Sequence, residues 1–238
     1  MVRGNSPLKA VRMCGRFSLG VSTDDLVEEF GIAEGSLDWS PRFNIAPSQD
    51  VAAVVAGEGG PRIGTLRWGL VPHWADDPAI GNRLINARAE SVADKPAFRD
   101  AFRARRCLIL ADGFYEWQRP EKGTTKVPVH VRLPDGRPFA FAGLWERWQP
   151  RHGEPLHTCT IITTDAAPSI RTVHDRMPVI LRPDQRQQWI RGDTPPATLL
   201  SMLRPYAGLL TAHPVSTVVN SPDNDSPDCV IPVGDALT

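Results

Sequence analysis

The chain has 238 residues, with 27 Lys and Arg against 27 Asp and Glu, so its formal net charge is zero. Because a domain usually holds about 100–200 residues, this length fits one large domain or two small ones. Apolar residues at 41% and charged residues at 23% exclude wholesale disorder, and the neutral balance excludes nucleic-acid binding through bulk charge. No apolar run approaches the roughly 18–20 residues that span a bilayer.

The predicted elements are short, as expected for a chain with 23 Pro and 19 Gly. Ser22 and the acidic pair after it predict a helix that begins there and ends near Phe30. The later elements predicted by pattern are strands at 51–56 and 62–68, a helix at 99–106, strands at 107–110, 127–133, 138–141 and 158–163, helices at 183–189 and 196–203, and a strand at 215–219.

Two of these strands, 127–133 and 138–141, flank Pro134-Asp135-Gly136 and are expected to form a hairpin. The chain shows no internal repeat, no long linker and no shift in composition. The sequence therefore predicts a single mixed α+β domain, mainly antiparallel.

Cysteine is sparse, and no Cys-x-x-Cys pair occurs among Cys14, Cys107, Cys159 and Cys229. We therefore expect neither a zinc site nor a disulfide framework, and a reducing, cytoplasmic environment. Cys107 and Cys159 lie in apolar strand-like runs and are predicted to be small buried hydrophobic residues.

Cys14 differs because it follows Met13 directly. Residues 1–12 are basic but lack the apolar segment of a signal peptide. We expect residues 1–13 to be a leader, absent from or removed in the mature protein, and residues 14–238 to form the domain. An N-terminal Cys14 would then carry a free α-amine beside its thiol.

Such a 1,2-aminothiol condenses with an aldehyde to an imine, and the thiol then closes a thiazolidine ring. With ordinary pKa values of about 7.7–8.0 for the amine and about 8.5 for the thiol, both groups need only modest activation. The alternative is that Cys14 is an ordinary strand residue.

Four polar side chains stand within otherwise structural segments. Asn86 and Arg88 share one face if their segment is extended. Glu116 lies among aromatic residues, where desolvation would raise its pKa and suit it to proton transfer, unless it is a satisfied core carboxylate. His174 precedes two charged residues and is either a proton-transfer group or a hydrogen-bonded turn residue.

The same Cys, His and Asn types also fit a thiol hydrolase, and residue types alone do not separate the two chemistries. The remaining histidines that we considered show neither metal-ligand nor catalytic spacing and are expected to be structural: His73, His130, His152 and His157.

Local clustering of cations would still allow nucleic-acid binding. Residues 99–106 carry four Arg against one Asp, and further Arg residues lie near Trp68 and Trp74. Arginine beside stacking aromatic rings suits single-stranded nucleic acid, although a basic helix face is more often simply solvated. Four Asp residues within 221–235 offset this basic region in the net sum.

Seven segments in order resemble the SRAP family, the SOS response-associated peptidase-like proteins that process abasic sites in DNA. They are Met13–Phe17, Arg42–Pro47, Arg67–Pro72, Asn86–Glu90, Ala111–Trp117, Val173–Pro178 and His213–Ser216. The resemblance covers nearly the whole chain from Met13 onward. It implies a single, barrel-like, β-rich α+β domain with several short helices.

The resemblance also implies the chemistry. An N-terminal Cys14 would form a thiazolidine with the ring-opened aldehyde of an abasic site, in a covalent, lyase-like DNA–protein reaction of the DNA-damage (SOS) response. Asn86 would orient the α-amine, Glu116 would assist proton transfer, and His174 would act as acid and base in opening the deoxyribose ring. DNA contacts are implied for Arg16, Asn44, Trp68, Trp74, Arg88 and Arg176.

The implied partner is single-stranded DNA with abasic sites, including junctions with duplex, bound by a monomer associated with the nucleoid on damaged DNA. No cofactor, metal or membrane is expected. In the family the cysteine directly follows the initiator Met, whereas twelve residues precede Met13 here. With those residues attached the Cys14 nitrogen is an amide, and no thiazolidine forms. The alternatives are a thiol-dependent peptidase that removes its own leader and a noncatalytic single-strand binder.

Overall fold

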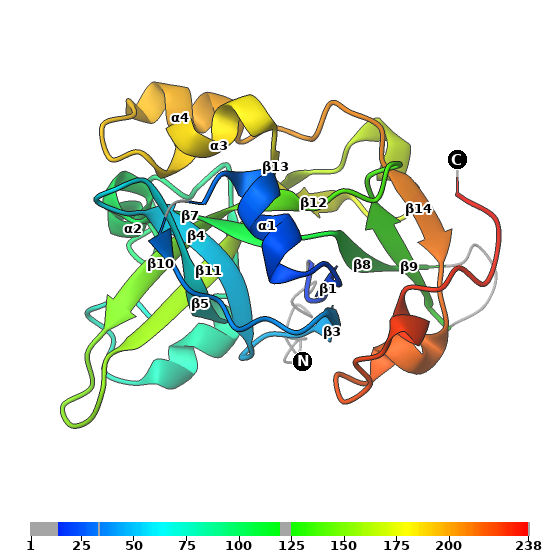
Figure 1. The fold of residues 1–238 in the computed structure, drawn as a ribbon, viewed down its shortest axis with the longest axis horizontal. Coiled ribbons are helices and arrows are strands. Elements are labelled where there is room, and N and C mark those ends of the chain that lie inside the picture. Colours follow the sequence, from blue (N-terminus) through cyan, green and yellow to red (C-terminus); the bar gives the residue numbers. More distant parts are fainter. Residues whose placement is uncertain (1–13, 33, 120–124, 238) are drawn as a thin grey trace, which may run out of the picture.

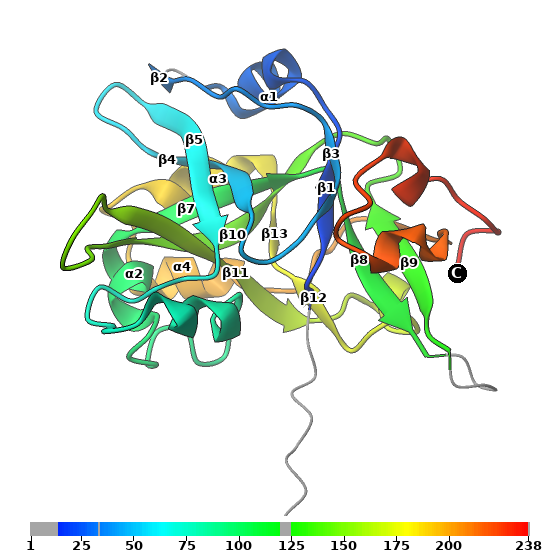
Figure 2. The same cartoon turned by 90° about the horizontal axis from the view of Figure 1, so that it is seen from below.

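Two sheets form the body of the protein in the computed structural model, which describes residues 14–32, 34–119 and 125–237. Five strands make the first sheet, in the order β14 (Thr211–Pro214), β9 (Val127–Arg132), β8 (Gly113–Gln118), β1 (Phe17–Leu19) and β3 (Arg42–Ile45). All the pairings within this sheet are antiparallel. Figure 2 shows β1 between β3 and β8.

The second sheet curls into a ring. Its main order is β12 (Arg176–Pro178), β11 (Leu156–Asp165), β10 (Phe139–Trp148), β7 (Arg106–Ala111), β4 (Asp50–Ala56), β5 (Pro61–Trp68) and β2 (Glu34–Gly35). Two short strands join its sides: β13 (Ile180–Leu181) pairs with β10, and β6 (Asn86–Arg88) pairs with β11. Because β5 also pairs with β11, the strands from β11 through β10, β7, β4 and β5 close on themselves. The single, mainly antiparallel, barrel-like α+β domain predicted from the sequence is confirmed.

Aromatic side chains fill the space between the two sheets. The Phe17 ring of β1 lies 5.2 Å from the Trp68 ring and 5.7 Å from the Phe141 ring, centroid to centroid. Phe114 and Phe139 contact Phe141 in turn. These five side chains are fully buried or nearly so, and such edge-to-face packing fixes β1 against the ring of strands.

Helices cover the outside of the ring: α1 (Thr23–Phe30), α2 (Arg99–Ala104), α3 (Pro183–Ile190) and α4 (Pro196–Met202). Ser22 caps α1 reciprocally with Asp25, and Gly31 ends it in the left-handed region at φ 58°. Figure 1 shows α3 and α4 side by side along one edge of the molecule.

One buried guanidinium joins two of these helices. Arg106 donates to the carbonyls of Phe102 and Arg103 at the end of α2, and to those of Trp189 and Arg191 at the end of α3. These carbonyls have no partner within their own helices, so Arg106 terminates both. It also explains why the helix predicted over 99–106 ends at residue 104, since Arg106 already belongs to β7.

Two predicted elements were wrong. Strands β9 and β10 do not form a hairpin, because β9 pairs with β8 over six residues while β10 pairs with β7 and β11. The turn at residues 134–136, with Gly136 at φ 71°, carries the chain from one sheet to the other. The predicted strand at 215–219 is instead a 3-10 helix, η3 (Thr217–Asn220), which begins where the Ser216 hydroxyl accepts from the Val218 N–H.

The remaining short helices lie in the connections: η1 (Pro78–Arg83), η2 (Pro168–Ile170) and η4 (Pro227–Cys229). The segment that carries η3 and η4, residues 215–230, is called the C-terminal strap below. It lies beside β3, β8 and β9, far from α3 and α4 (Figure 1).

Candidate active site

Cys14 lies just before β1, where that strand runs antiparallel to β8. The Tyr115 N–H donates to the Arg16 carbonyl, and this register brings the Cys14 nitrogen opposite the Glu116 side chain. The Cys14 N–H donates to Glu116 Oε1 at 3.1 Å. Cys14 is 1% exposed and Glu116 is 4% exposed, so this contact is inside the protein.

Asn86 approaches the same residue from the other sheet. Its strand, β6, runs parallel to β11, with Asn86 opposite Ile161. The Asn86 side-chain amide donates to the Cys14 carbonyl at 3.1 Å. Cys14 is therefore held at both ends of its backbone, the nitrogen by Glu116 and the carbonyl by Asn86.

His174 completes the group from the turn between η2 and β12. Its Nε2 lies 3.9 Å from Glu116 Oε2, and its Nδ1 lies 3.0 Å from Asp175 Oδ1. The Nδ1 atom is also 3.1 Å from the backbone N–H of Arg176. Four residues that are distant in sequence thus meet at one place, as the resemblance implied: Cys14, Asn86, Glu116 and His174.

Burial dominates the electrostatics of this group. Desolvation raises the pKa of Glu116 to about 8, although the Cys14 N–H and the charge of Lys126 act to lower it. The carboxyl is therefore mostly protonated at neutral pH and able to give or take a proton near pH 8. This confirms the desolvation predicted for Glu116 from its aromatic neighbours.

The Cys14 thiol is more strongly affected than the sequence suggested. Burial raises the pKa of the thiol well above its ordinary value, and the Glu116 charge adds to this rise. The expectation that the thiol needs only modest activation was wrong for this structure, because a thiolate formed at this buried position would lose its solvation by water.

Arg16, two residues beyond Cys14, is tied to the C-terminal strap. Its guanidinium donates to Asn44 Oδ1 at 2.7 Å and to the Val219 carbonyl at 2.8 Å, and it lies 5.8 Å from the centre of the Trp117 ring. Burial lowers the pKa of Arg16. The Trp117 indole N–H donates in turn to Asn220 Oδ1 at 2.7 Å.

The other side chains implied to contact DNA fall into two classes. Asn44 and Trp68 are fully buried. Asn44 donates to three carbonyls of the strap, and Trp68 donates to the Ile85 carbonyl at 2.8 Å. In this structure neither side chain offers a surface on which DNA could stack or bind. Trp68 is packed between the two sheets, and Asn44 is hydrogen-bonded to the strap.

Trp74, Arg88 and Arg176 lie nearer the surface. Trp74 is 51% exposed and lines a cavity of about 410 Å³ together with Arg83. Arg88 is exposed at the end of β6. Arg176 is instead engaged in a bidentate ion pair with Glu90, at 2.6 and 3.0 Å, and an ion pair with Asp165 at 2.7 Å.

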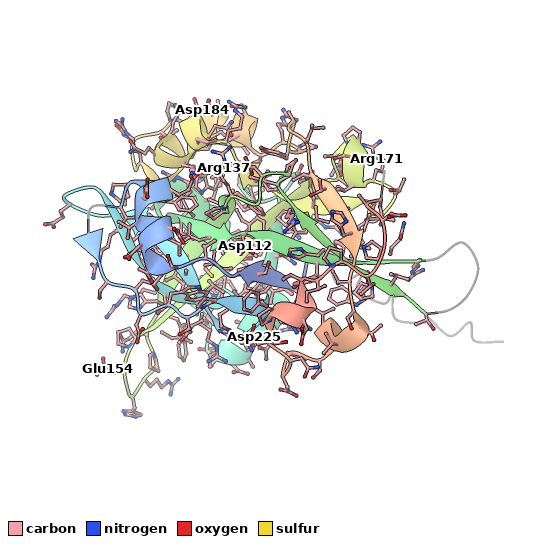
Figure 3. All side chains as sticks on the ribbon, turned by 45° about the vertical axis from the view of Figure 1, so that its right-hand side comes forward. Asp112, Arg137, Glu154, Arg171, Asp184 and Asp225 are labelled. Atoms are coloured by element: carbon pink, nitrogen blue, oxygen red, sulfur yellow. The ribbon has the colours of Figure 1, made fainter. Side chains whose placement is uncertain are left out.

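Sequence reasoning missed three contributors. Asp175 reaches His174, Trp117 stacks near Arg16, and Asp225 of the strap accepts from the Phe43 and Asn44 N–H groups and from Arg42. Only Asp175 had a signal in the sequence, since it adjoins His174 in the same motif. Figure 3 shows Asp225 on the opposite side of the molecule from Asp184.

A family model of known proteins described as SOS response associated peptidase (SRAP) matches residues 13–222 of this chain. The chain belongs to the SRAP family. It is 45% identical to abasic site processing protein YoqW of Bacillus subtilis, over 92% of this chain and 99% of that protein. It is 30% identical to abasic site processing protein HMCES of Xenopus tropicalis, over 92% and 78% of the two chains.

Solved structures share the SRAP fold seen here. A protein from Bacteroides thetaiotaomicron superposes with a TM-score of 0.83 at 22% identity, over 92% of this chain and all of that one. A phage-related protein of Bordetella bronchiseptica superposes with a TM-score of 0.67 at 29% identity, over 85% and 94% of the two chains.

Within the described residues, no three His, Cys, Asp or Glu side chains are grouped so that they could hold a metal ion. In that same part of the chain, no helix has the length and apolar character to cross a membrane.

Proposed function

We propose that this SRAP protein processes abasic sites by binding single-stranded DNA and linking Cys14 covalently to the lesion. The observation that carries the proposal is the meeting of Cys14, Glu116, Asn86 and His174 in one buried group. The names of the relatives, abasic site processing proteins, supply the substrate class. The proposal requires that residues 1–13 be absent, so that the Cys14 nitrogen is an amine.

The reaction balances with the loss of one water. The Cys14 amine attacks the C1′ aldehyde of the opened deoxyribose, and loss of water leaves an imine. The thiol sulfur then adds to the imine carbon while its proton passes to the nitrogen, which gives the thiazolidine. The raised pKa of the buried thiol fits this order, because the amine acts first and the thiol needs to ionise only as it adds.

Each neighbour has a part in these steps. Asn86 fixes the Cys14 carbonyl and so points the amine toward Glu116. Glu116 exchanges protons with that nitrogen as the water leaves, at a pKa of about 8 that suits both directions. His174 acts on the sugar, in opening the ring and in reversing the link. Trp74 and Arg88 are the exposed groups for base stacking and phosphate contact, whereas Arg16 and Arg176 are engaged by partners within the protein.

The test uses protein that begins at Cys14, incubated with single-stranded DNA containing one abasic site. We expect an adduct that survives SDS, and no adduct from Cys14→Ala or from the 238-residue chain with its leader intact. Cys107→Ser is the matched control, because Cys107 is equally buried but lies on β7 in the core, and it should still form the adduct. An adduct of unchanged amount from Cys14→Ala would overturn the proposal, and equal binding of abasic and intact DNA without any adduct would favour a noncatalytic binder.

A second activity, removal of the leader by the protein itself, has its own supporting geometry. The nitrogen released by cleavage between Met13 and Cys14 is the one that lies 3.1 Å from the mostly protonated Glu116 carboxyl, which could protonate it as it leaves. Intact mass of the full chain over time tests this. Loss of residues 1–13 that stops in Cys14→Ala supports a thiol-dependent peptidase, and a leader that stays intact after long incubation contradicts it.

These activities place the protein in the DNA-damage response, in the cytoplasm and on the nucleoid where DNA is damaged, acting on single strands and on their junctions with duplex. Both activities also predict that the protein acts as a monomer, since the whole group lies within one chain.

A further inference from the structure

Two neighbours of the His174 Nδ1 atom require opposite protonation states. The Arg176 backbone N–H, at 3.1 Å, donates and therefore needs a lone pair on Nδ1. The Asp175 carboxylate, at 3.0 Å, accepts and therefore needs a proton on Nδ1. A ring nitrogen of histidine offers one or the other, so only one of these two contacts is a hydrogen bond at a given moment.

Whether Nδ1 carries a proton decides whether Nε2, which faces Glu116, can release its own proton. When Nδ1 accepts from Arg176, the neutral ring has its only proton on Nε2, and releasing that proton would leave an imidazolate that is inaccessible at neutral pH. When Nδ1–H donates to Asp175, the ring can release a proton from Nε2 and remain a neutral imidazole. Only the second arrangement allows His174 to work as a reversible acid and base.

We propose that Asp175 is a positioning residue of the reaction: its carboxylate keeps a proton on Nδ1 of His174, so that Nε2 can exchange a proton with the deoxyribose. This inference rests on the function proposed above. As the C1′–O4′ bond breaks, the charged ring gives its Nε2 proton to O4′, and solvent takes the proton of the C1′ hydroxyl. The ring keeps Nδ1–H and regains the other proton from solvent.

The charges around His174 favour this assignment. Glu116 on β8 lies 3.9 Å from Nε2, but burial keeps it mostly neutral at pH 7, and the nearby Lys126 brings a positive charge. In the described part of the chain, Asp175 is therefore the carboxylate best placed to stabilise a charged His174 ring. Its side chain is 83% exposed, and its backbone carbonyl is fixed by the Ala166 N–H at 2.9 Å.

The competing contact is held rigidly. The Arg176 guanidinium is bound by Glu90, Asp165 and the Thr163 carbonyl, which fixes the Arg176 backbone N–H beside Nδ1. The Arg176 N–H is thus a fixed competitor at Nδ1, and the Asp175 carboxylate is the group that holds the proton there against it.

The experiment compares Asp175→Asn with the unmodified protein beginning at Cys14. An asparagine keeps the size of the side chain but loses the charge and can donate to Nδ1, which favours the proton on Nε2. We expect the adduct to form about tenfold more slowly near pH 7.5. The alkaline limb of the rate should also move to lower pH, because the Asp175 charge contributes to the raised pKa of Glu116. Affinity for DNA with a tetrahydrofuran site, which has no aldehyde, should not change.

Asp175→Glu should restore most of the rate, since it restores the charge. Asp165→Asn is the matched control: it removes another exposed carboxylate from the same edge, but one that contacts Arg176 rather than His174, so the pH profile should keep its position. An Asp175→Asn rate and pH profile identical to the parent would overturn the inference.

A second readout does not depend on the adduct. The ¹⁵N shifts of the His174 ring report which nitrogen carries the proton, and we expect Nδ1 protonated in the parent and Nε2 protonated in Asp175→Asn. The same ring state in both proteins would contradict the inference. If the parent forms no adduct at all, the proposed function fails, whereas a parent adduct with an indifferent Asp175→Asn defeats only this inference.

Discussion

Glu116 is the residue at which position and chemistry are most closely linked. Its carboxyl lies in the interior because β8 is packed on both faces, and that burial raises its pKa to about 8. The same burial that costs stability when the carboxyl ionises keeps it neutral and reactive at physiological pH. The Cys14 N–H donates to this carboxyl and ties its state to the proposed nucleophile.

A pH-dependent stability follows for the full 238-residue chain, in which the Cys14 nitrogen is an amide. Because the folded pKa of Glu116 lies above its ordinary value of 4.5, the folded state holds one more proton than the unfolded state between pH 4.5 and about 8. The contribution of Glu116 to stability is present below about pH 4.5 and is lost as pH rises through 8.

Urea unfolding of the full chain and of Glu116→Gln, at pH 5 and pH 9, measures the contribution of Glu116 to stability. Relative to the glutamine variant, the parent should lose a few kcal/mol of unfolding free energy between the two values. Parallel pH dependence in the two proteins would show that Glu116 is not desolvated.

The C-terminal strap shows how an irregular element supports a strand. Asn44 on β3 donates to the carbonyls of Val219, Ser221 and Asn224, and Asp225 accepts from the N–H groups of β3. Asp225 lies beyond residue 222, where the match to the SRAP family model ends. The strap therefore satisfies an edge of the first sheet, and through Val219 it also holds Arg16.

Asp225→Ala should remove this support. It leaves two backbone N–H groups and Arg42 without their acceptor, so we expect a loss of about 2–3 kcal/mol in unfolding free energy. Asp228→Ala in the same strap is the control and should change stability by less than about 0.5 kcal/mol, because Asp228 is exposed. Equal small effects in chemical denaturation of both variants would mean that the strap is not held by Asp225.

At the scale of the whole molecule, the two sheets meet at the proposed site. Glu116 lies on β8 of the first sheet, and Cys14 directly precedes β1 of the same sheet. Asn86 lies on β6 of the second sheet, and His174 lies in the segment that leads into β12. A neutral overall charge is compatible with a local DNA site here, because some of the cations are already paired with carboxylates or carbonyls inside the protein. Arg16 and Arg176 are engaged by internal partners, whereas Arg88 at the end of β6 and Arg83 beside Trp74 are exposed and available to phosphates.

This distribution predicts a shallow salt dependence. Each phosphate contact with single-stranded DNA contributes a slope of about −0.7 to the logarithm of the binding constant against the logarithm of salt concentration. With Arg88 and Arg83 available we expect a total slope between about −1 and −3 for noncovalent binding to a tetrahydrofuran-containing strand. Fluorescence anisotropy between 50 and 300 mM NaCl, roughly the useful range, measures it, and a slope steeper than about −5 would show a much wider contact surface.

Local patterns in the chain predicted its regular elements well. Helices α1, α3 and α4 and strands β4, β5, β7 and β11 lie within a few residues of their predicted positions, since caps, prolines and apolar periodicity act over short distances. The hairpin between β9 and β10 was wrong, because β9 pairs with β8 while β10 pairs with β7 and β11, and the local turn pattern does not encode these distant partners.

The sequence by itself determined the family, the single α+β domain and the chemically able residues, because motifs and periodicity survive without coordinates. Only the tertiary structure decided which of those residues meet. It grouped Cys14, Asn86, Glu116 and His174 across two sheets, buried Trp68 and Asn44, and brought Asp175 to His174. Burial and contact between distant segments set pKa values and hydrogen-bond partners, and neighbours along the chain indicated only the direction of the Glu116 shift.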